Sequence, residues 1–443
     1  MVNAATKAGP KRRVLIVSPH FSPINAPDMQ RVRMMLPYVR ENGWEPVVLA
    51  TDPALVEGGV HEPLLEKSYP SDIRVVRSGG IPANYTRWAH FGSLWWRCGA
   101  SMRAAGERLL REERFDLVFF STTFFDAFSL GPRWRRKFGV PYVLDYQDPW
   151  INDYYERTGT PPPGGRFKFG LSQWLARRRE PDAVGAASGL IAVSGAYGDG
   201  LVRRYPWLDR SRVAVLPFAT DRNDFRLAKQ HQPEKPIIDF GDGMRHFVYA
   251  GRCGPDMSTS LGIIFRSFRK FLASNPGEAR RTRFHFIGTD YAPPPRGREW
   301  AAPVARAEGV SEFVHEHCYR VPYFDCLHYL THADGLLVVG SNDASYSASK
   351  LFPYVLSERP LLVVFHERSP VLRMAREMGC DQCFGFDQPE DLDSVSESVF
   401  RSWYMEGGMS RFPPADKERI IPHTAEVMTR QLTAYFDEAV RPS

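Results

Sequence analysis

The sequence has few cysteines and no long hydrophobic run, and each scarcity excludes a class of protein. Six cysteines lie at irregular spacings among 443 residues, a pattern typical of a reducing compartment rather than of a disulfide-held fold. The longest uncharged apolar runs, such as 15–18 and 335–340, are strand-length and far below the ~20 residues that span a membrane. The basic amino terminus leads directly into a strand-like run, unlike a secretory signal. We therefore expect a soluble cytoplasmic protein.

A nucleic-acid-binding motif is also missing, and the basic residues form no continuous run. The charge is nevertheless uneven. Residues 1–230 contain 33 Lys and Arg against 23 Asp and Glu, a balance of +10, whereas the rest of the chain has 24 against 28. This asymmetry predicts two domains with different partners. An anionic membrane surface or a phosphate-bearing substrate fits the basic half better than nucleic acid does.

What the sequence does contain is a regular alternation of short apolar runs with helical patterns, which predicts a parallel α/β architecture. A polar stretch at 221–236 interrupts the alternation and is expected to be a linker. We therefore predict two doubly wound sheets in series. Ligands in such sheets bind at the carboxyl ends of the strands, so the cleft between the two sheets is the expected active site.

Eight segments, taken in order and spacing, resemble motifs of the GT-B-fold glycosyltransferases, specifically the large retaining family 4: 18–50, 116–122, 141–150, 187–201, 213–225, 249–254, 284–290 and 347–364. The resemblance implies two Rossmann-like domains facing each other across a cleft. The first, 1–225, is expected to bind the acceptor and the second, 235–415, the nucleotide-sugar. The segment 416–443 is expected to be a helix that packs towards the first domain. The implied enzyme is hexosyltransferase-like, retains the anomeric configuration and needs no metal or other cofactor. Its donor is a UDP-, GDP- or dTDP-sugar, with UDP favoured.

The loop after the first strand carries His20 and Asn25 and leads into a helix that Asp28 is suited to start. The resemblance implies that this loop lies near the transferred sugar or the diphosphate. His20 is then expected to take part in the chemistry, and Asn25, Asp28 and Arg31 are expected near the acceptor. A rigid turn with a hydrogen-bonded histidine is the alternative, and Arg31 would then simply face solvent.

Asp148 follows the apolar strand at 141–147 and therefore lies at the carboxyl end of that strand. A carboxylate there can accept a proton from an acceptor hydroxyl or hold a sugar hydroxyl. The segment resembles the Asp-x-Arg-Asp-x-Trp motif of the family, which implies a catalytic Asp148. The alternative is an aspartate that accepts backbone hydrogen bonds in the turn before Pro149. Asp145 is expected to be the buried, structural carboxylate of the pair.

The second half offers a donor site. Gly251 lets the backbone approach a diphosphate closely, and Arg252 is suited to bind it through two parallel hydrogen bonds. An exposed loop arginine is the alternative. The resemblance adds Gly288 and a hydroxyl-rich turn at a helix N-terminus, which is a good anion site: Ser345, Ser347, Ser349 and Lys350. No lysine follows Arg252 where relatives carry one.

Two features leave alternatives open. Ser345 and Pro353 stand where relatives carry two glutamates, so the alternative is a GT-B protein that binds a sugar nucleotide or glycan without turnover, or a GT-B epimerase. Residues 85–114 interleave tryptophan with arginine, which is typical of a headgroup interface, although an amphipathic helix with a tryptophan core gives the same pattern. With the +10 balance, this predicts peripheral attachment at the inner face of the membrane. The acceptor is then expected to be a lipid-linked or otherwise anionic glycan or small molecule.

Overall fold

The structure is a computed structural model that describes residues 12–57, 59–85, 93–152, 165–292, 294–344, 350–406 and 415–441. The chain divides into two compact units. Unit 1 comprises residues 1–219 and 425–443, and unit 2 comprises residues 220–424. No helix within the described ranges is long and apolar enough to cross a membrane.

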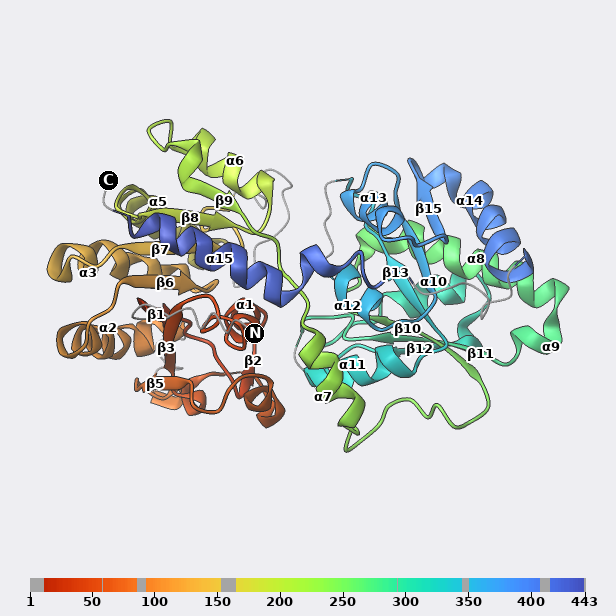
Figure 1. The fold of residues 1–443 in the computed structure, drawn as a ribbon. Helices are drawn as coiled ribbons and strands as arrows, with labels where there is room; N and C mark the ends of the chain where they lie inside the picture. The colour runs from red at the N-terminus through yellow and green to blue at the C-terminus, as the bar shows by residue number, and fades with distance from the viewer. Residues whose placement is uncertain are drawn as a thin grey trace, which may run out of the picture. The chain divides into compact units, whose positions relative to one another are not determined.

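Unit 1 is built on a sheet of seven parallel strands in the order β5-β3-β1-β6-β7-β8-β9 (Figure 1). The central strands are buried along nearly their whole length, because helices cover both faces of the sheet. The strands are β1 (Arg12–Val17), β3 (Trp44–Thr51), β5 (Arg74–Ser78), β6 (Leu117–Ser121), β7 (Tyr142–Tyr146), β8 (Gly189–Ala192) and β9 (Val213–Val215), beside a short pair, β2 (Ile24–Asn25) and β4 (Val60–His61).

The helices of unit 1 are α1 (Gln30–Met35), α2 (Leu94–Glu112), α3 (Leu130–Phe138), α5 (Arg166–Gly185), α6 (Gly195–Arg204) and α15 (Ala425–Ala439). The last helix, α15, lies along the sheet of unit 1 although it ends the chain (Figure 1). Phe436 packs against Trp44 and Phe119, with ring centroids 5.5 and 5.0 Å apart. The Tyr435 hydroxyl accepts a hydrogen bond from the backbone N–H of Leu190, so the end of the chain completes the core of the first unit.

Unit 2 is built on six parallel strands in the order β12-β11-β10-β13-β14-β15. Its strands are β10 (Arg245–Ala250), β11 (Thr282–Ile287), β12 (Val314–His317), β13 (Gly335–Val339), β14 (Leu361–His366) and β15 (Cys383–Phe386). Its helices are α7 (Arg222–Gln230), α8 (Ser258–Ser274), α9 (Pro276–Ala279), α10 (Ala301–Ala307), α11 (Tyr323–His332), α12 (Leu351–Leu356), α13 (Pro370–Glu377) and α14 (Leu392–Val399), followed by a π-helical turn (Phe400–Glu406). The predicted α/β class with two doubly wound sheets is therefore confirmed.

The segment expected to be a linker, 221–236, instead contains α7. Asp221 starts this helix by accepting a hydrogen bond from the backbone N–H of Asn223 at 2.9 Å. Phe225 and Ala228 are buried, so a mostly polar sequence still supplies an apolar helix face. The division between the units falls after residue 219 rather than at 225, and the final segment returns to unit 1 at 425 rather than at 416.

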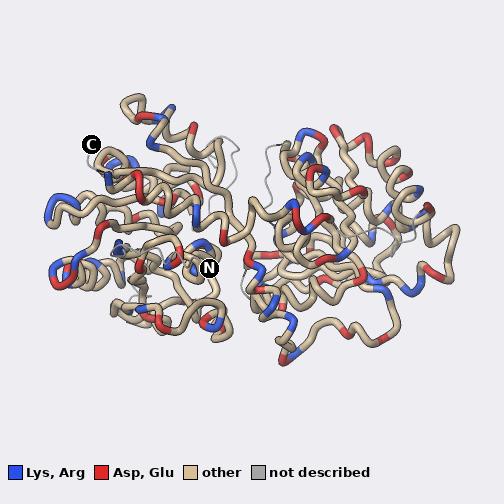
Figure 2. The backbone as a smooth tube through the Cα atoms, viewed as in Figure 1, with Lys and Arg blue, Asp and Glu red and all other residues tan. Residues whose placement is uncertain are grey.

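The basic excess of the first half forms no single block in space. Figure 2 shows Lys and Arg interspersed with Asp and Glu along both units. Local groups of charge, rather than the overall sum, must therefore decide what each surface binds.

Candidate functional site

In unit 1, the loops that follow β1, β6, β7 and β8 leave the same edge of the sheet, because these four parallel strands are neighbours. They bring His20, Thr122, Asp148 and Tyr197 to one edge from four separate segments of the sequence. Polar side chains at the carboxyl edge of a parallel sheet are the usual setting for a ligand site.

His20 is held by a buried carboxylate. Its Nδ1 lies 2.9 Å from Oδ1 of Asp28, and its ring meets the ring of Phe124 edge to face at 4.7 Å. Asp28 Oδ2 accepts further hydrogen bonds from the Thr122 hydroxyl at 2.9 Å and from the backbone N–H of Thr123 at 3.3 Å. Burial alone would raise the pKa of Asp28, but these bonds and the charge of His20 outweigh it and lower the pKa. The ionised Asp28 orients the imidazole and leaves its Nε2 for another partner.

Arg31 occupies a different place from the one expected. Its guanidinium is buried and donates from Nε to Oδ2 of Asp145 at 2.8 Å, and from a terminal nitrogen to the carbonyl oxygen of Leu216 at 2.7 Å. Asp145 also accepts a hydrogen bond from the Ser121 hydroxyl at 2.7 Å. Arg31 is only 1% exposed, so it offers no surface to an acceptor, and we assign it a structural part. The burial of Asp145 agrees with its expected structural part.

Asn25 is likewise used within the fold. Its amide nitrogen donates to Glu62 at 3.1 Å, and its oxygen accepts from Gln30 at 3.1 Å. Of the three residues expected near the acceptor, Asn25, Asp28 and Arg31 all have their polar groups engaged by neighbouring side chains. Of the three, Asp28 bonds directly to His20.

Asp148 is exposed at the carboxyl end of β7. Desolvation by the surrounding protein raises the pKa of this carboxyl, and a hydrogen bond with the side chain of Tyr197 opposes part of the rise. Tyr197 lies in the first turn of α6, where the Ser194 hydroxyl caps the helix by accepting from the Tyr197 backbone N–H at 3.4 Å. The sequence reasoning missed Tyr197. Its one sequence signal was the serine cap just after a buried strand.

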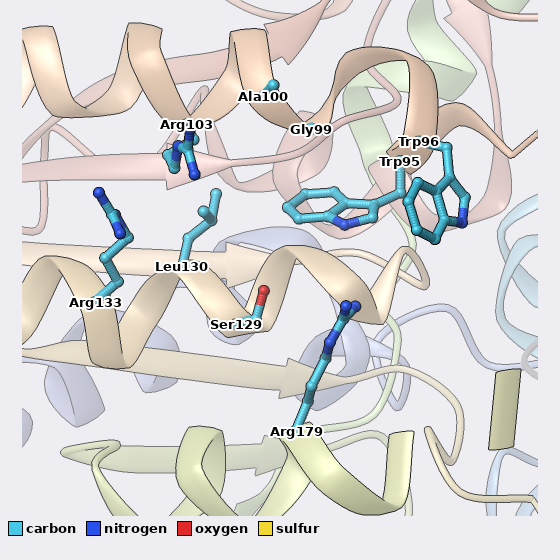
Figure 3. A pocket seen from close by; sticks show the side chains of 9 residues that line it. All are labelled: Trp95, Trp96, Gly99, Ala100, Arg103, Ser129, Leu130, Arg133 and Arg179. Carbon is cyan, nitrogen blue, oxygen red and sulfur yellow. The ribbon is translucent and has the colours of Figure 1, made fainter. Parts of the chain in front are cut away.

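A pocket of 340 Å³ opens beside this edge, between α2, α3 and α5 (Figure 3). Its walls combine aromatic and cationic side chains: Trp95, Trp96, Gly99, Ala100, Arg103, Ser129, Leu130, Arg133 and Arg179. Arg133 pairs with Glu107 at 2.7 Å and Arg179 with Asp126 at 2.5 Å, whereas Arg103 is exposed and pairs with no carboxylate among the described residues.

The pocket lies close to the His20 loop. Trp95 and Gly99 also line a smaller cavity of 10 Å³ whose walls include Pro19 and Phe124. Phe124 is the residue whose ring meets that of His20. The aromatic–cationic pocket is therefore separated from His20 by little more than one layer of side chains.

In unit 2, Gly251, Lys350 and Tyr249 meet at the turn after β10. Gly251 has a φ of +144°, a conformation that suits glycine, and a Cβ at this position would overlap the end of the Lys350 side chain. Lys350 Nζ donates to the Tyr249 hydroxyl at 2.6 Å and lies 4.5 Å from the centre of that ring. Burial, with repulsion from Arg252, lowers the pKa of Lys350 to about 8, although Cys253, Cys326 and Asp256 act in the opposite direction.

Arg252 lies on the same turn and forms a bidentate ion pair with Asp256. The two nitrogen–oxygen distances are 2.8 and 3.2 Å. Burial would raise the pKa of Asp256, but the bonds with Arg252 outweigh it and lower the pKa. Asp256 also accepts the backbone N–H of Asn342 at its own carbonyl oxygen, at 2.7 Å, which ties the turn after β10 to the loop after β13.

Gly288 occupies the corresponding turn after β11, with a φ of +69°. Its N–H donates to the carbonyl oxygen of His317 at 2.8 Å, and a Cβ there would have no heavy atom closer than 3.9 Å. The glycine is therefore required by the backbone conformation and not by crowding. The expected donor residues Gly251, Arg252, Gly288 and Lys350 all lie at the carboxyl edge of this sheet, whereas Ser345, Ser347 and Ser349 lie outside the described residues.

Lys350, which the resemblance implied for the donor site, reaches the arginine turn from a position 98 residues after Arg252. It supplies a second cation there, although no lysine follows Arg252 in the local sequence. Tyr249 and Asp256, which hold the two cations, were missed. Across the described ranges, no group of three or more His, Cys, Asp or Glu side chains could hold a metal ion.

Residues 30–219 match the family model of the glycosyl transferase 4-like domain. No curated protein matches the chain. A solved structure of Anabaena HepE in complex with UDP and glucose aligns with a TM-score of 0.57 at 13% identity, covering 96% of this chain and 99% of that one. A Rickettsia africae glycosyltransferase gives 0.58 at 11%, covering 98% and 100%. A UDP-forming α,α-trehalose-phosphate synthase from Burkholderia xenovorans gives 0.55 at 12%, covering 98% and 100%. At these identities the likeness shows the fold alone.

Proposed function

We propose that this GT-B-fold chain, whose residues 30–219 match the glycosyl transferase 4-like domain, transfers a sugar from a UDP-sugar to an anionic acceptor. The anomeric configuration is retained, and no divalent metal is required. The observation that carries the proposal is the meeting of two cations, Arg252 and Lys350, at the glycine turn after β10.

The cationic turn is suited to a diphosphate. Arg252 presents a planar fork that matches phosphate oxygens, and Lys350 adds a compact charge beside it. When the bond between the anomeric carbon and the diphosphate oxygen breaks, negative charge grows on the leaving group, and these two cations stabilise it. UDP is favoured because the Anabaena neighbour binds UDP and the Burkholderia neighbour is named for forming it.

In unit 1, Asp148 and His20 are the groups that we assign to bind hydroxyls. The raised pKa of Asp148 makes its carboxylate a stronger base than an ordinary aspartate, so we assign it the proton that the acceptor hydroxyl releases as its oxygen bonds to the anomeric carbon. His20, oriented by Asp28, offers Nε2 to a hydroxyl of the transferred sugar. The acceptor oxygen bonds to the anomeric carbon on the face from which UDP leaves, so the new bond replaces the broken one with the configuration retained.

The acceptor side of the proposal is supported by the pocket between α2, α3 and α5. An arginine with no carboxylate partner among the described residues, Arg103, lines this pocket together with Trp95. Indole faces pack on sugar rings or acyl chains, and arginine pairs with phosphate or carboxylate. An acceptor with an apolar or sugar part and an anionic group matches both.

The test is to incubate the full-length protein with a panel of UDP-, GDP- and dTDP-hexoses and to follow the products by mass spectrometry. We expect one UDP-sugar to release UDP and free sugar without added acceptor or metal. Conversion of the donor to an isomer of equal mass, separated by chromatography before mass spectrometry, would assign the protein to the epimerases. Stabilisation by nucleotide in a thermal shift assay, with no release from any donor, would assign it to binding without turnover.

A further inference from the structure

The helix α5 is apolar on two opposite sides. Ala176, Ala183 and Val184 are buried, where the helix packs on α3 and on the turn at 125–129. On the exposed side, Phe167 is 86% exposed, and Leu171 and Trp174 are each 49% exposed. Three large apolar side chains are therefore open to solvent within eight residues of one helix.

The spacing of these residues places them on one face. Phe167, Leu171 and Trp174 follow one another at intervals of four and three residues, so they line one stripe of a helix with 3.6 residues per turn. The buried positions at 173, 176, 180, 183 and 184 lie on the opposite side by the same geometry. A soluble helix normally has one apolar face, and apolar residues on both sides indicate that both sides are covered.

The charge of this segment indicates what covers it. Residues 166–179 contain five cations and no carboxylate, in contrast to the mixed charges along most of the chain (Figure 2). Arg166, Lys168, Arg177 and Arg178 are all exposed, and the Arg178 guanidinium lies 4.1 Å from the centre of the Trp174 ring. Cations beside aromatic and aliphatic side chains on one helix face match a surface of anionic headgroups over acyl chains.

The same composition continues onto α2. Trp96, in the first turn of that helix, is 59% exposed and lines the pocket to which α5 contributes Arg179. The stretch 85–114, expected to form the interface, divides in the structure: Arg97 is 4% exposed and binds backbone carbonyl oxygens, while residues 86–92 lie outside the described part. The sequence pattern therefore pointed to α2, but the larger exposed apolar stripe is on α5.

We propose that the exposed face of α5 docks on an anionic membrane surface. Phe167, Leu171 and Trp174 enter the headgroup layer, while Arg166, Lys168, Arg177 and Arg178 pair with lipid phosphates. This inference goes beyond sugar transfer and does not depend on it, since none of these side chains is assigned a part in the reaction.

The test is co-sedimentation of the full-length protein with phosphatidylcholine vesicles, with and without phosphatidylglycerol, at low and high salt. Three variants are compared: F167S/L171S/W174S, which removes the apolar stripe; R166E/K168E, which reverses charge; and W207S, which removes a side chain that is 54% exposed elsewhere on unit 1. Melting curves and UDP-sugar hydrolysis are recorded for each, and they should match the wild type because every substituted side chain is exposed.

We expect wild type and W207S to bind only the anionic vesicles. The stripe variant should bind at least about tenfold more weakly, and the charge variant should lose most of the salt-sensitive binding. Equal binding by wild type and the stripe variant would overturn the proposal. So would a wild-type dimer in sedimentation velocity that the stripe variant abolishes, because a second copy of the chain would then cover this face.

Discussion

The carboxyl edges of the two sheets differ in the sign and state of their charged groups. In unit 1, Asp28 and Asp145 are buried and paired with His20 and Arg31, so their charge serves to hold these two side chains in place. In unit 2, Arg252 and Lys350 lie at one glycine turn, and burial lowers the pKa of Lys350. In the proposed function, the edge of unit 1 therefore positions groups that bind hydroxyls, and the edge of unit 2 binds an anion.

The two units share one architecture, but the loops at the carboxyl edge of each sheet carry different chemical groups. Both edges use loops that follow parallel strands, and both use side chains from distant parts of the sequence. What separates them is the local balance of charge. Carboxylates hold His20 and Arg31 in unit 1, whereas in unit 2 two cations share one turn with the carboxylate of Asp256. The predictions below change that balance on one side and measure the effect on both.

The largest effect is expected from Arg31→Met. The substitution leaves the Asp145 carboxylate buried without its cation, and breaking such a pair costs about 3–5 kcal/mol of unfolding free energy. Chemical denaturation followed by circular dichroism measures it, and the double variant R31M/D145L should recover much of the loss, because both charges are gone. An unchanged unfolding free energy with a raised KM for the acceptor would return Arg31 to the acceptor site.

Arg252→Ala is expected to weaken UDP binding by about 1.5–3 kcal/mol, because a charge-assisted pair of hydrogen bonds to the diphosphate is lost. Isothermal titration calorimetry measures this. Arg269→Ala is the matched control: this residue also lies in unit 2 and pairs with Glu308 at 3.3 Å, but it is on the far part of α8. Equal affinity of the Arg252 variant and the wild type would remove the arginine from the donor site.

A smaller effect follows from the lowered pKa of Lys350. With a value of about 8 in place of the usual 10.5, the amine loses its proton as the pH rises through 8, and a diphosphate binds the protonated form. UDP affinity should therefore fall about tenfold between pH 7 and 9. Lys350→Arg should bind UDP with nearly the same affinity at both pH values, since arginine keeps its charge. A wild-type affinity that does not change over this range would contradict the assignment.

In the protein without nucleotide, the same pKa shift makes the free energy of unfolding rise with pH. The folded state favours the neutral amine, so burying Lys350 lowers stability below pH 8, and that cost disappears as the pH approaches 10.5. Nucleotide should reverse the trend by favouring the charged form. Thermal melts with and without UDP across this range report both signs.

The sequence predicted the strands well, because buried parallel strands are continuous apolar runs. The expected run at 246–251 is β10 at 245–250, and the run at 13–19 contains most of β1. The sequence predicted fewer of the contacts that build the two sites. Arg31 and Asp145 are 114 positions apart, and Lys350 and Tyr249 are 101, so their pairing depends on the sheet order. The two apolar sides of α5 were hidden for a similar reason: only the packed structure shows which side the core covers.

The substitution Asp148→Asn tests most directly the claim that unit 1 provides the base while unit 2 binds the donor. The substitution removes the base from unit 1 and leaves unit 2 untouched, so turnover of the UDP-sugar should fall by about 100-fold or more, while the UDP affinity and the melting temperature stay at the wild-type values. Because the pKa of Asp148 is raised, the wild-type rate should also decline towards acid at a higher pH than an ordinary aspartate would give. Asp199→Asn, an exposed carboxylate of the same unit, is the control. Wild-type turnover by the Asp148 variant, or a parallel loss of UDP affinity, would contradict the account.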